Sequence, residues 1–285
     1  MKYFVLLFVC MVFYFNSSAQ KIYINTFAGL STYEGDLQES FFSVKQSRLA
    51  FGAGLSYKIN DHVSIRTGVT FASITADDKN NAKVAYRNLN FTSNIAEIHV
   101  AAEYYLFSLD ERRLSPYFFI GIAGYHFNPY THDTGGVKYY LQPLSTEGQG
   151  FYQNRKPYKL NQLAIPIGGG IKWAVTDNIH IGIESGVRKL FTDYLDDVST
   201  TYVDPNLILA NRGQKALELA YRGGEVKPGA SYPTGLLKRG EAKRKDLYLF
   251  TGVTLSFRLE NAETFQYRMK IRSNKRQAGC PSRVY

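Results

Sequence analysis

Histidine is the side chain that most readily serves as a general base, so the five histidines are the first guide to activity. They are His62, His99, His126, His132 and His180, and none lies in an HExxH pattern. A hydrolase could use His126 or His132, with Asp133 beside them, as its base. No serine or carboxylate at a suitable spacing marks a nucleophile. The sequence therefore predicts a protein without catalytic residues or a cofactor.

Three carboxylates in the stretch TDYLDDVSTTYVD, namely Asp193, Asp196 and Asp197, could supply oxygen ligands for calcium. The stretch lacks the Gly-centred spacing of an EF-hand loop. A solvated acidic turn is the preferred interpretation, and no metal site is predicted.

The first residues indicate an exported protein. MKYFVLLFVCMVFYFNSSAQ combines one lysine, an apolar run and then small and polar residues, as secretory signal peptides do. We expect a signal peptide over residues 1–19, cleaved after Ala19 or Gln20. Cys10 lies inside it, so the mature chain would hold one cysteine, Cys280. An unpaired thiol in an oxidising compartment suggests an intermolecular disulfide or a reactive site, and a tolerated free thiol is the alternative.

Eight segments of about ten residues show the alternation that places successive side chains on opposite faces of a strand. No stretch after the signal peptide approaches the roughly 20 apolar residues of a membrane helix. The chain is rich in Tyr (22), Phe (19) and Gly (24), and alternating segments separated by turn residues are typical of a transmembrane β-barrel. The predicted fold is all-β, an eight-stranded antiparallel barrel over residues 20–259. Its strands are expected at 21–31, 48–59, 62–75, 94–107, 115–127, 161–175, 178–190 and 246–259.

The connections between these strands predict the orientation. Short turns alternate with long loops, and outer-membrane barrels keep their short turns on the periplasmic side. The long loops at 32–47, 76–93, 128–160 and 191–245 should therefore face outward. An even number of strands would return the C-terminal tail, residues 260–285, to the periplasm.

Side-chain parity places five charged residues inside the barrel. Apolar residues must face lipid, where a charge would cost a few kcal/mol, so Arg66, Glu97, Glu103, Lys172 and Glu184 should point into the lumen. An eight-stranded barrel is only wide enough for its own side chains, and buried charges need partners. We therefore expect a charge network that fills the barrel, and not an open pore.

The tail after residue 259 differs from the barrel. It holds six bases against two acids, a net charge of about +4. Tyr267, Met269 and Ile271 alternate with Arg268, Lys270 and Arg272, so the segment could add as a strand to a partner's sheet edge. A ninth spanning strand is the alternative, and it would place Cys280 outside.

The formal net charge of +10 raises the question of nucleic acid. No recognisable RNA- or DNA-binding module accompanies the bases, and no small-molecule substrate is indicated. Excess positive charge on an envelope protein is better matched to acidic lipid, lipopolysaccharide phosphates or an acidic protein.

Several stretches together resemble the PorG family of outer-membrane β-barrels. They are YEGDL at 33–37, SPYFFIGIAGYHFNP at 115–129, YLQPLSTEGQG at 140–150, GVRKLFTDYLDDVSTTYVDP at 186–205 and the CP pair at 280–281. The resemblance implies a place in the type IX secretion apparatus. It implies that the barrel anchors a periplasmic ring of the lipoprotein PorK and the protein PorN, with Cys280 in a disulfide to the PorK-like partner. The last residues, SRVY, differ from the CPxF-like ending of that family.

Two functions of different classes follow. One is a non-catalytic anchor that docks a periplasmic partner through the tail and Cys280. The other is an outward-facing binding or adhesion barrel that uses the long aromatic loops at 128–160 and 191–245.

Overall fold

A computed structural model describes residues 21–38, 44–152, 154–233 and 237–259. The predicted signal peptide and tail, including Cys280, lie outside the described residues.

Eight long strands form the barrel, each pairing antiparallel with its neighbours. The sheet runs β1-β2-β3-β4-β5-β8-β9-β10 and closes where β10 pairs with β1. At this seam Gly29 lies opposite Gly252, and a Cβ on Gly252 would sit 2.4 Å from Ala28 O, so only glycine permits the approach. The eight-stranded antiparallel barrel predicted from sequence is thus confirmed. The strands are Ile22–Glu34, Arg48–Lys58, Val63–Asp77, Asn90–Tyr105, Leu114–His126, Asn161–Ala174, Ile179–Leu190 and Leu247–Arg258.

Large apolar side chains cover the outside of the barrel. Phe71, Ile98, Ile122, Leu163 and Ile183 come from five different strands, and each exposes at least 61% of its surface. Residues of the opposite parity are mostly buried, as the alternating burial of β3 and β4 shows. An apolar exterior around a polar interior is the arrangement of a membrane-spanning barrel.

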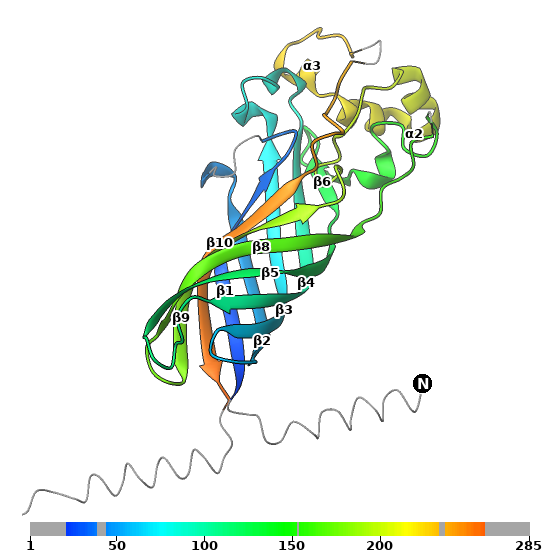
Figure 1. Ribbon diagram of the computed structural model, residues 1–285. Helices are drawn as coiled ribbons and strands as arrows, with labels where there is room; N and C mark the ends of the chain where they lie inside the picture. The colour runs from blue at the N-terminus through cyan, green and yellow to red at the C-terminus, as the bar shows by residue number, and fades with distance from the viewer. Residues whose placement is uncertain (1–20, 39–43, 153, 234–236, 260–285) are drawn as a thin grey trace, which may run out of the picture.

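The two ends of the barrel differ in their connections (Figure 1). One end carries the short turns after β2, β4 and β8. At the same end β1 starts and β10 finishes. There the Leu259 N–H donates to Ile22 O at 2.8 Å. The other end carries the long connections after β1, β3, β5 and β9. We call these the turn end and the loop end.

The loop-end connections contain structure of their own, which the sequence analysis did not predict. After β5, a hairpin of β6 (Pro129–His132) and β7 (Lys138–Tyr140) extends the sheet, and after β9 come α2 (Pro205–Ala220) and α3 (Gly223–Val226). Asp204 caps α2 by accepting from Asn206 N–H, Pro205 occupies the first turn, and Gly213 with φ 82° interrupts the helix. The short 3-10 helices are η3 (Val44–Gln46), η4 (Asp78–Asn80), η5 (Ala85–Arg87) and η6 (Gln142–Leu144).

No helix in the described part of the chain combines the length and the apolar character needed to span a membrane.

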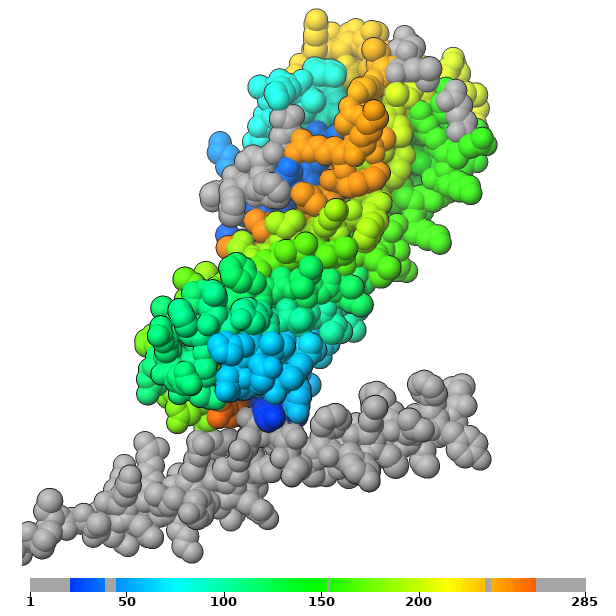
Figure 2. Space-filling model, viewed as in Figure 1, coloured from blue at the N-terminus to red at the C-terminus, as the bar shows by residue number. Residues whose placement is uncertain are grey.

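The main hydrophobic core joins the loops to the barrel. Leu195 and Val198 from the β9–β10 connection pack with Tyr125, Tyr248 and Phe250, which point inward from the strands. Figure 2 shows the loop segments as one packed mass at that end of the barrel. We call the folded connections at the loop end the cap. It has a second core of its own around α2, formed by Val203, Ile208, Ala216 and Ala220.

Candidate functional site

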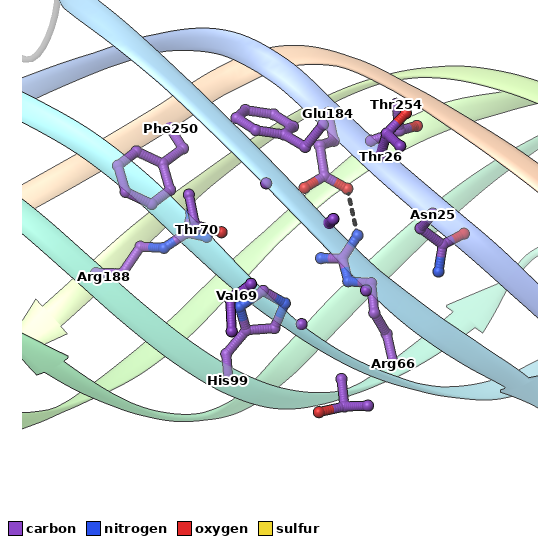
Figure 3. Close-up of a pocket in the computed structure, with 16 residues that line it drawn as sticks. Asn25, Thr26, Arg66, Val69, Thr70, His99, Glu184, Arg188, Phe250 and Thr254 are labelled. Carbon is purple, nitrogen blue, oxygen red and sulfur yellow. Dashed lines mark hydrogen bonds and ion pairs between the residues drawn. The ribbon is translucent and has the colours of Figure 1, made fainter.

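Charged side chains from several strands meet in the barrel lumen. Arg66 Nη1 lies 2.7 Å from Glu184 Oε2 and 3.1 Å from Glu103 Oε1, and Lys172 Nζ lies 3.7 Å from Glu103 Oε2. Figure 3 shows the Arg66 guanidinium directed at Glu184. The structure thus brings together four of the five residues for which the sequence predicted a lumen network, one of them from each of β3, β4, β8 and β9.

Tyrosine hydroxyls complete the hydrogen bonding of these charges. Tyr117 OH donates to Glu184 Oε2 at 2.6 Å, and Tyr105 OH donates to Glu103 Oε2 at 2.6 Å while accepting from Lys172 Nζ at 2.6 Å. Buried ions need such partners because each has lost its hydration. The arrangement holds four strands together across the interior.

Glu97, the fifth predicted residue, belongs to a separate group nearer the loop end. Its carboxylate lies 3.3 Å from Arg188 Nε and 3.3 Å from His99 Nδ1, and it accepts from Tyr248 OH at 2.7 Å. Sequence reasoning missed Arg188. The parity that placed Glu184 inside also applies to Arg188, four residues further along β9, and would have identified it.

The space left inside the lumen is small. A cavity of about 30 Å³ lies beside Arg66, His99 and Glu184 (Figure 3), and another of about 30 Å³ lies near Tyr105 and Lys172. Each has room for about one water molecule. Toward the cap the interior is filled by rings, with Phe127, Tyr158 and Tyr194 stacked at centroid distances of 6.1 and 4.9 Å. The lumen of the described barrel is therefore a packed interior.

At the turn end, ion pairs tie the last strand to the β4–β5 turn. Asp110 in that turn pairs with Lys58 and lies 3.4 Å from Arg258 Nη2. Arg258 also donates to Tyr23 OH at 2.6 Å, which links β10 to β1. Arg258 is the last residue of β10, so these contacts hold the end of the last described strand.

The cap contains buried ion pairs of its own. Arg239 Nη1 donates to Glu147 Oε1 at 3.0 Å, and the same carboxylate accepts from the N–H groups of Ser199 and Thr200. Arg239 Nε donates to Ala220 O at 3.1 Å. One guanidinium thus joins the β5–β8 connection to the β9–β10 connection.

The acidic run at 193–197 is buried, so the expected solvated turn is wrong. Asp196 and Asp197 lie under the cap, where Asp197 Oδ1 accepts from Tyr158 OH at 2.8 Å. Burial raises the pKa of Asp197 to about 6, although Arg239 opposes the shift, and burial raises the pKa of Asp193 to about 7. Sequence periodicity could not reveal this, because the covering residues come from other loops. No group of three or more acids, histidines or cysteines that could hold a metal ion occurs among the described residues.

His126 and His132, the histidines considered for catalysis, are both exposed near the loop end. His126 is exposed at the end of β5 and contacts Asn161 Oδ1 at 2.8 Å. His132 is exposed on β6 with its ring against Tyr130, and the neighbouring Asp133 accepts from backbone N–H groups and from Lys215. Within the described part of the chain, no hydrogen bond joins either histidine to a hydroxyl group.

The remaining predicted site residues lie in the tail, outside the described residues. They are Tyr267, Arg268, Met269, Lys270, Ile271, Arg272 and Cys280.

Comparison with known proteins gives similar barrels at low sequence identity. Neisserial surface protein A (NspA) shares 10% identity at a TM-score of 0.41, over 84% of this chain and 97% of that one. Ail of Yersinia pestis in complex with the heparin analogue sucrose octasulfate shares 8% at 0.38, over 83% and 97%. OprG from Pseudomonas aeruginosa shares 6% at 0.38, over 84% and 97%.

The sequence matches none of the curated proteins. Residues 1–206 match the family model described as "Domain of unknown function (DUF6089)". Because this match covers well over half of the chain, the chain belongs to the DUF6089 family.

Proposed function

We propose that the protein is a non-catalytic anchor in the bacterial outer membrane for a protein-secretion machine of the type IX kind. In this proposal the barrel spans the membrane and the tail, residues 260–285, extends into the periplasm. There it docks a ring built from a PorK-like lipoprotein and a PorN-like protein, and Cys280 forms a disulfide with the lipoprotein. The resemblance to the PorG family, given by the motifs quoted above, supplies the identity of the partners.

The observation that carries the proposal is the position of the last described strand. β10 ends at Arg258 on the turn end, beside the start of β1, where Leu259 N–H donates to Ile22 O. Short turns lie on the periplasmic side of outer-membrane barrels. A tail that continues from this end therefore starts on the side where a periplasmic partner is available.

The packed lumen supports an anchoring role over transport. Arg66, Glu103 and Glu184 occupy the middle of the barrel with their partners, and the cavities beside them hold about one water each. A barrel without a path for solutes is suited to hold other components at the membrane. The ion pairs of Asp110 with Lys58 and Arg258 hold the end of β10, the strand that precedes the tail.

The covalent part is tested by non-reducing electrophoresis of native outer membranes. We expect an adduct of higher mass that contains the protein and a lipoprotein, and that disappears with reductant and in Cys280→Ser. An unchanged set of adducts in Cys280→Ser would refute the disulfide.

The docking part needs a charge-matched comparison within the tail. Replacing Arg268, Lys270 and Arg272 by Gln removes three bases from the alternating segment, whereas replacing Lys275, Arg276 and Arg283 removes three bases outside it. If the segment pairs with a partner's sheet edge, the first variant loses the co-purified ring proteins and the second keeps them. Equal retention in both variants would exclude docking through the alternating segment.

The orientation has its own test. On cells treated with a membrane-permeant reductant, which frees Cys280 from its disulfide, a maleimide that cannot cross the outer membrane should leave Cys280 unmodified while the membrane is intact and modify it after the membrane is opened. Labelling of intact cells at the same rate would place the tail outside and overturn the proposal.

A second candidate, an outward-facing adhesion or binding barrel, is favoured by the apolar surface of the cap. On α2, Leu207 exposes 41% and Leu209 exposes 43% of its surface, while Ile208 between them is buried in the cap. The double variant Leu207→Gln/Leu209→Gln should abolish attachment to a host or neighbouring-cell surface if the cap is a binding face. An anchor should keep its ring partners and secretion in the same variant.

A further inference from the structure

The exterior of the barrel has a groove across β2, β3 and β4 near the loop end. Its floor is formed by short side chains on adjacent strands, Ser73 and Ala96, flanked by Leu49 and Phe71 on one side and His126 on the other. The groove has a volume of about 460 Å³ and is mainly apolar. Small residues among large exposed neighbours thus make a slot in the surface that faces lipid.

The same three strands continue into a polar groove one step closer to the cap. It has a volume of about 240 Å³, and Thr75 and Thr92 follow Ser73 and Asn94 at the next outward positions of β3 and β4. Outward positions on one strand are about 7 Å apart, so the two grooves are neighbours along the strands. Two bases, Lys45 of η3 and Arg48 of β2, line this part.

The two bases of the polar groove are exposed in the part of the chain that the structure describes. Both Lys45 and Arg48 are exposed, and neither forms an ion pair with a residue that the structure describes. One acid, Asp77, also lines the groove, and its carboxylate accepts from the Lys79 N–H. The lining therefore has a net positive charge.

A buried amide provides a second polar feature. Gln46 is 5% exposed, lines the polar groove, and its Oε1 has no hydrogen-bond partner among the described residues. A buried carbonyl oxygen without a donor is costly, so a donor from a ligand would be favourable there.

We propose that this groove binds one phosphorylated glycolipid of the outer leaflet, of the lipid A kind. An acyl chain lies in the apolar part over Ser73 and Ala96. The phosphate lies between Lys45 and Arg48, and a sugar hydroxyl or amide N–H donates to Gln46 Oε1. The choice of the outer leaflet rests on the proposed orientation, in which the loop end faces outward.

The order of the two parts along the strands supports a membrane lipid as the occupant. Moving along β3 from Phe71 to Asp77, the lining passes from apolar to polar in the direction of the cap. A lipid in a bilayer presents its chains and its headgroup in that same order. A soluble anion would use the bases and leave the apolar slot empty.

Native mass spectrometry of the purified full-length barrel in detergent, titrated with lipid A, tests the site. The double variant Lys45→Gln/Arg48→Gln should weaken binding about 10- to 30-fold, from about 1 kcal/mol per base at a membrane surface. Lys159→Gln/Lys189→Gln is the matched control, because it removes two exposed bases near the other side of the same rim. An equal loss in both double variants would mean non-specific attraction and would overturn the proposal.

Blocking the slot without changing charge tests the acyl part. Ser73→Trp should reduce binding at least tenfold, whereas Ala102→Trp, on the exterior of β4 near the turn end, should leave it unchanged. The wild-type protein should bind lipid A that lacks its phosphates as weakly as it binds phosphatidylethanolamine. Retained binding in Ser73→Trp, or equal binding of the stripped lipid, would refute the assigned site.

These measurements use the purified protein without the ring proteins, so they do not depend on ring capture. Retained ring partners in the variant of Arg268, Lys270 and Arg272, together with the expected loss of lipid binding in Lys45→Gln/Arg48→Gln, would count against docking through the tail alone. Unchanged lipid binding in Lys45→Gln/Arg48→Gln, with normal ring capture, would count against the groove alone.

Discussion

Arg66 and Glu184 meet across the barrel, with Arg66 Nη1 2.7 Å from Glu184 Oε2, although β3 and β9 are not neighbours in the sheet. The pair therefore spans the interior, and it contacts Glu103 and Tyr117 from two further strands. A contact that joins non-adjacent strands resists both shear of the barrel and entry of solutes.

Arg66→Met should destabilise the barrel by about 3–5 kcal/mol, because it leaves Glu184 buried without its counter-charge and removes one of the two cations beside Glu103. The measurement is the urea midpoint of unfolding from lipid vesicles. Lys79→Met, which removes an exposed base at the loop end, should change the midpoint by no more than about 0.5 kcal/mol. Equal midpoints for the two variants would show that the lumen pair contributes nothing to stability.

Because the lumen is packed, we predict that the barrel conducts no ions across planar bilayers. Cavities of about 30 Å³ beside Arg66 and near Lys172 do not form a water-filled path, so purified protein should give no steady conductance. The control is a general porin reconstituted at the same protein-to-lipid ratio. Steady openings of porin size from the wild-type protein would contradict the packing of the lumen.

Arg239 is predicted to hold the cap together. Arg239→Met removes donors to Glu147 and Ala220 and leaves a buried carboxylate uncompensated, so the cap should lose about 3–5 kcal/mol of local stability. Limited proteolysis should then cut within residues 191–246 while the barrel strands stay intact. Lys238→Met, one residue away and 73% exposed in its side chain, is the matched control and should leave the cleavage pattern unchanged.

The buried acids predict that the cap is more stable at mildly acidic pH. Burial raises the pKa of Asp193 to about 7 and that of Asp36 to about 6, so the folded cap binds protons that the unfolded segment releases. Stability from these groups is complete below their unfolded pKa of about 4 and is lost as pH rises through about 6–7. Hydrogen exchange of residues 191–246, corrected for intrinsic rates, should show protection falling by on the order of 1–2 kcal/mol from pH 5 to pH 8.

An amide replacement separates this effect from a general response to pH. Asp193→Asn should reduce the pH dependence, because one of its two titrating groups is gone and Asp36 remains. Asp133→Asn should leave it unchanged, since hydrogen bonds from Val137 and Gly135 and the charge of Lys215 hold the Asp133 pKa below its usual range. A pH dependence that survives in Asp193→Asn with its full size would assign it to other groups.

Much of the fold is readable from the sequence because β-structure has a local period of two. The segments expected at 161–175 and 178–190 correspond to β8 at Asn161–Ala174 and β9 at Ile179–Leu190. The alternation of short and long connections likewise follows from turn residues near Asn60 and Asp177. Apolar side chains must face the lipid and polar side chains the interior of the barrel. Alternation along the strand is therefore enough to place Ile183 outside and Glu184 inside.

Only the tertiary structure decided which inward residues meet and what the loops build. Glu97 joins Arg188 and Tyr248, and not the network of Arg66, because strand register and tilt set the height of each side chain in the barrel. The burial of Asp197 depends on Arg239 and on Tyr158 of another loop. Such contacts join residues far apart in the chain, and no local pattern of side chains encodes them.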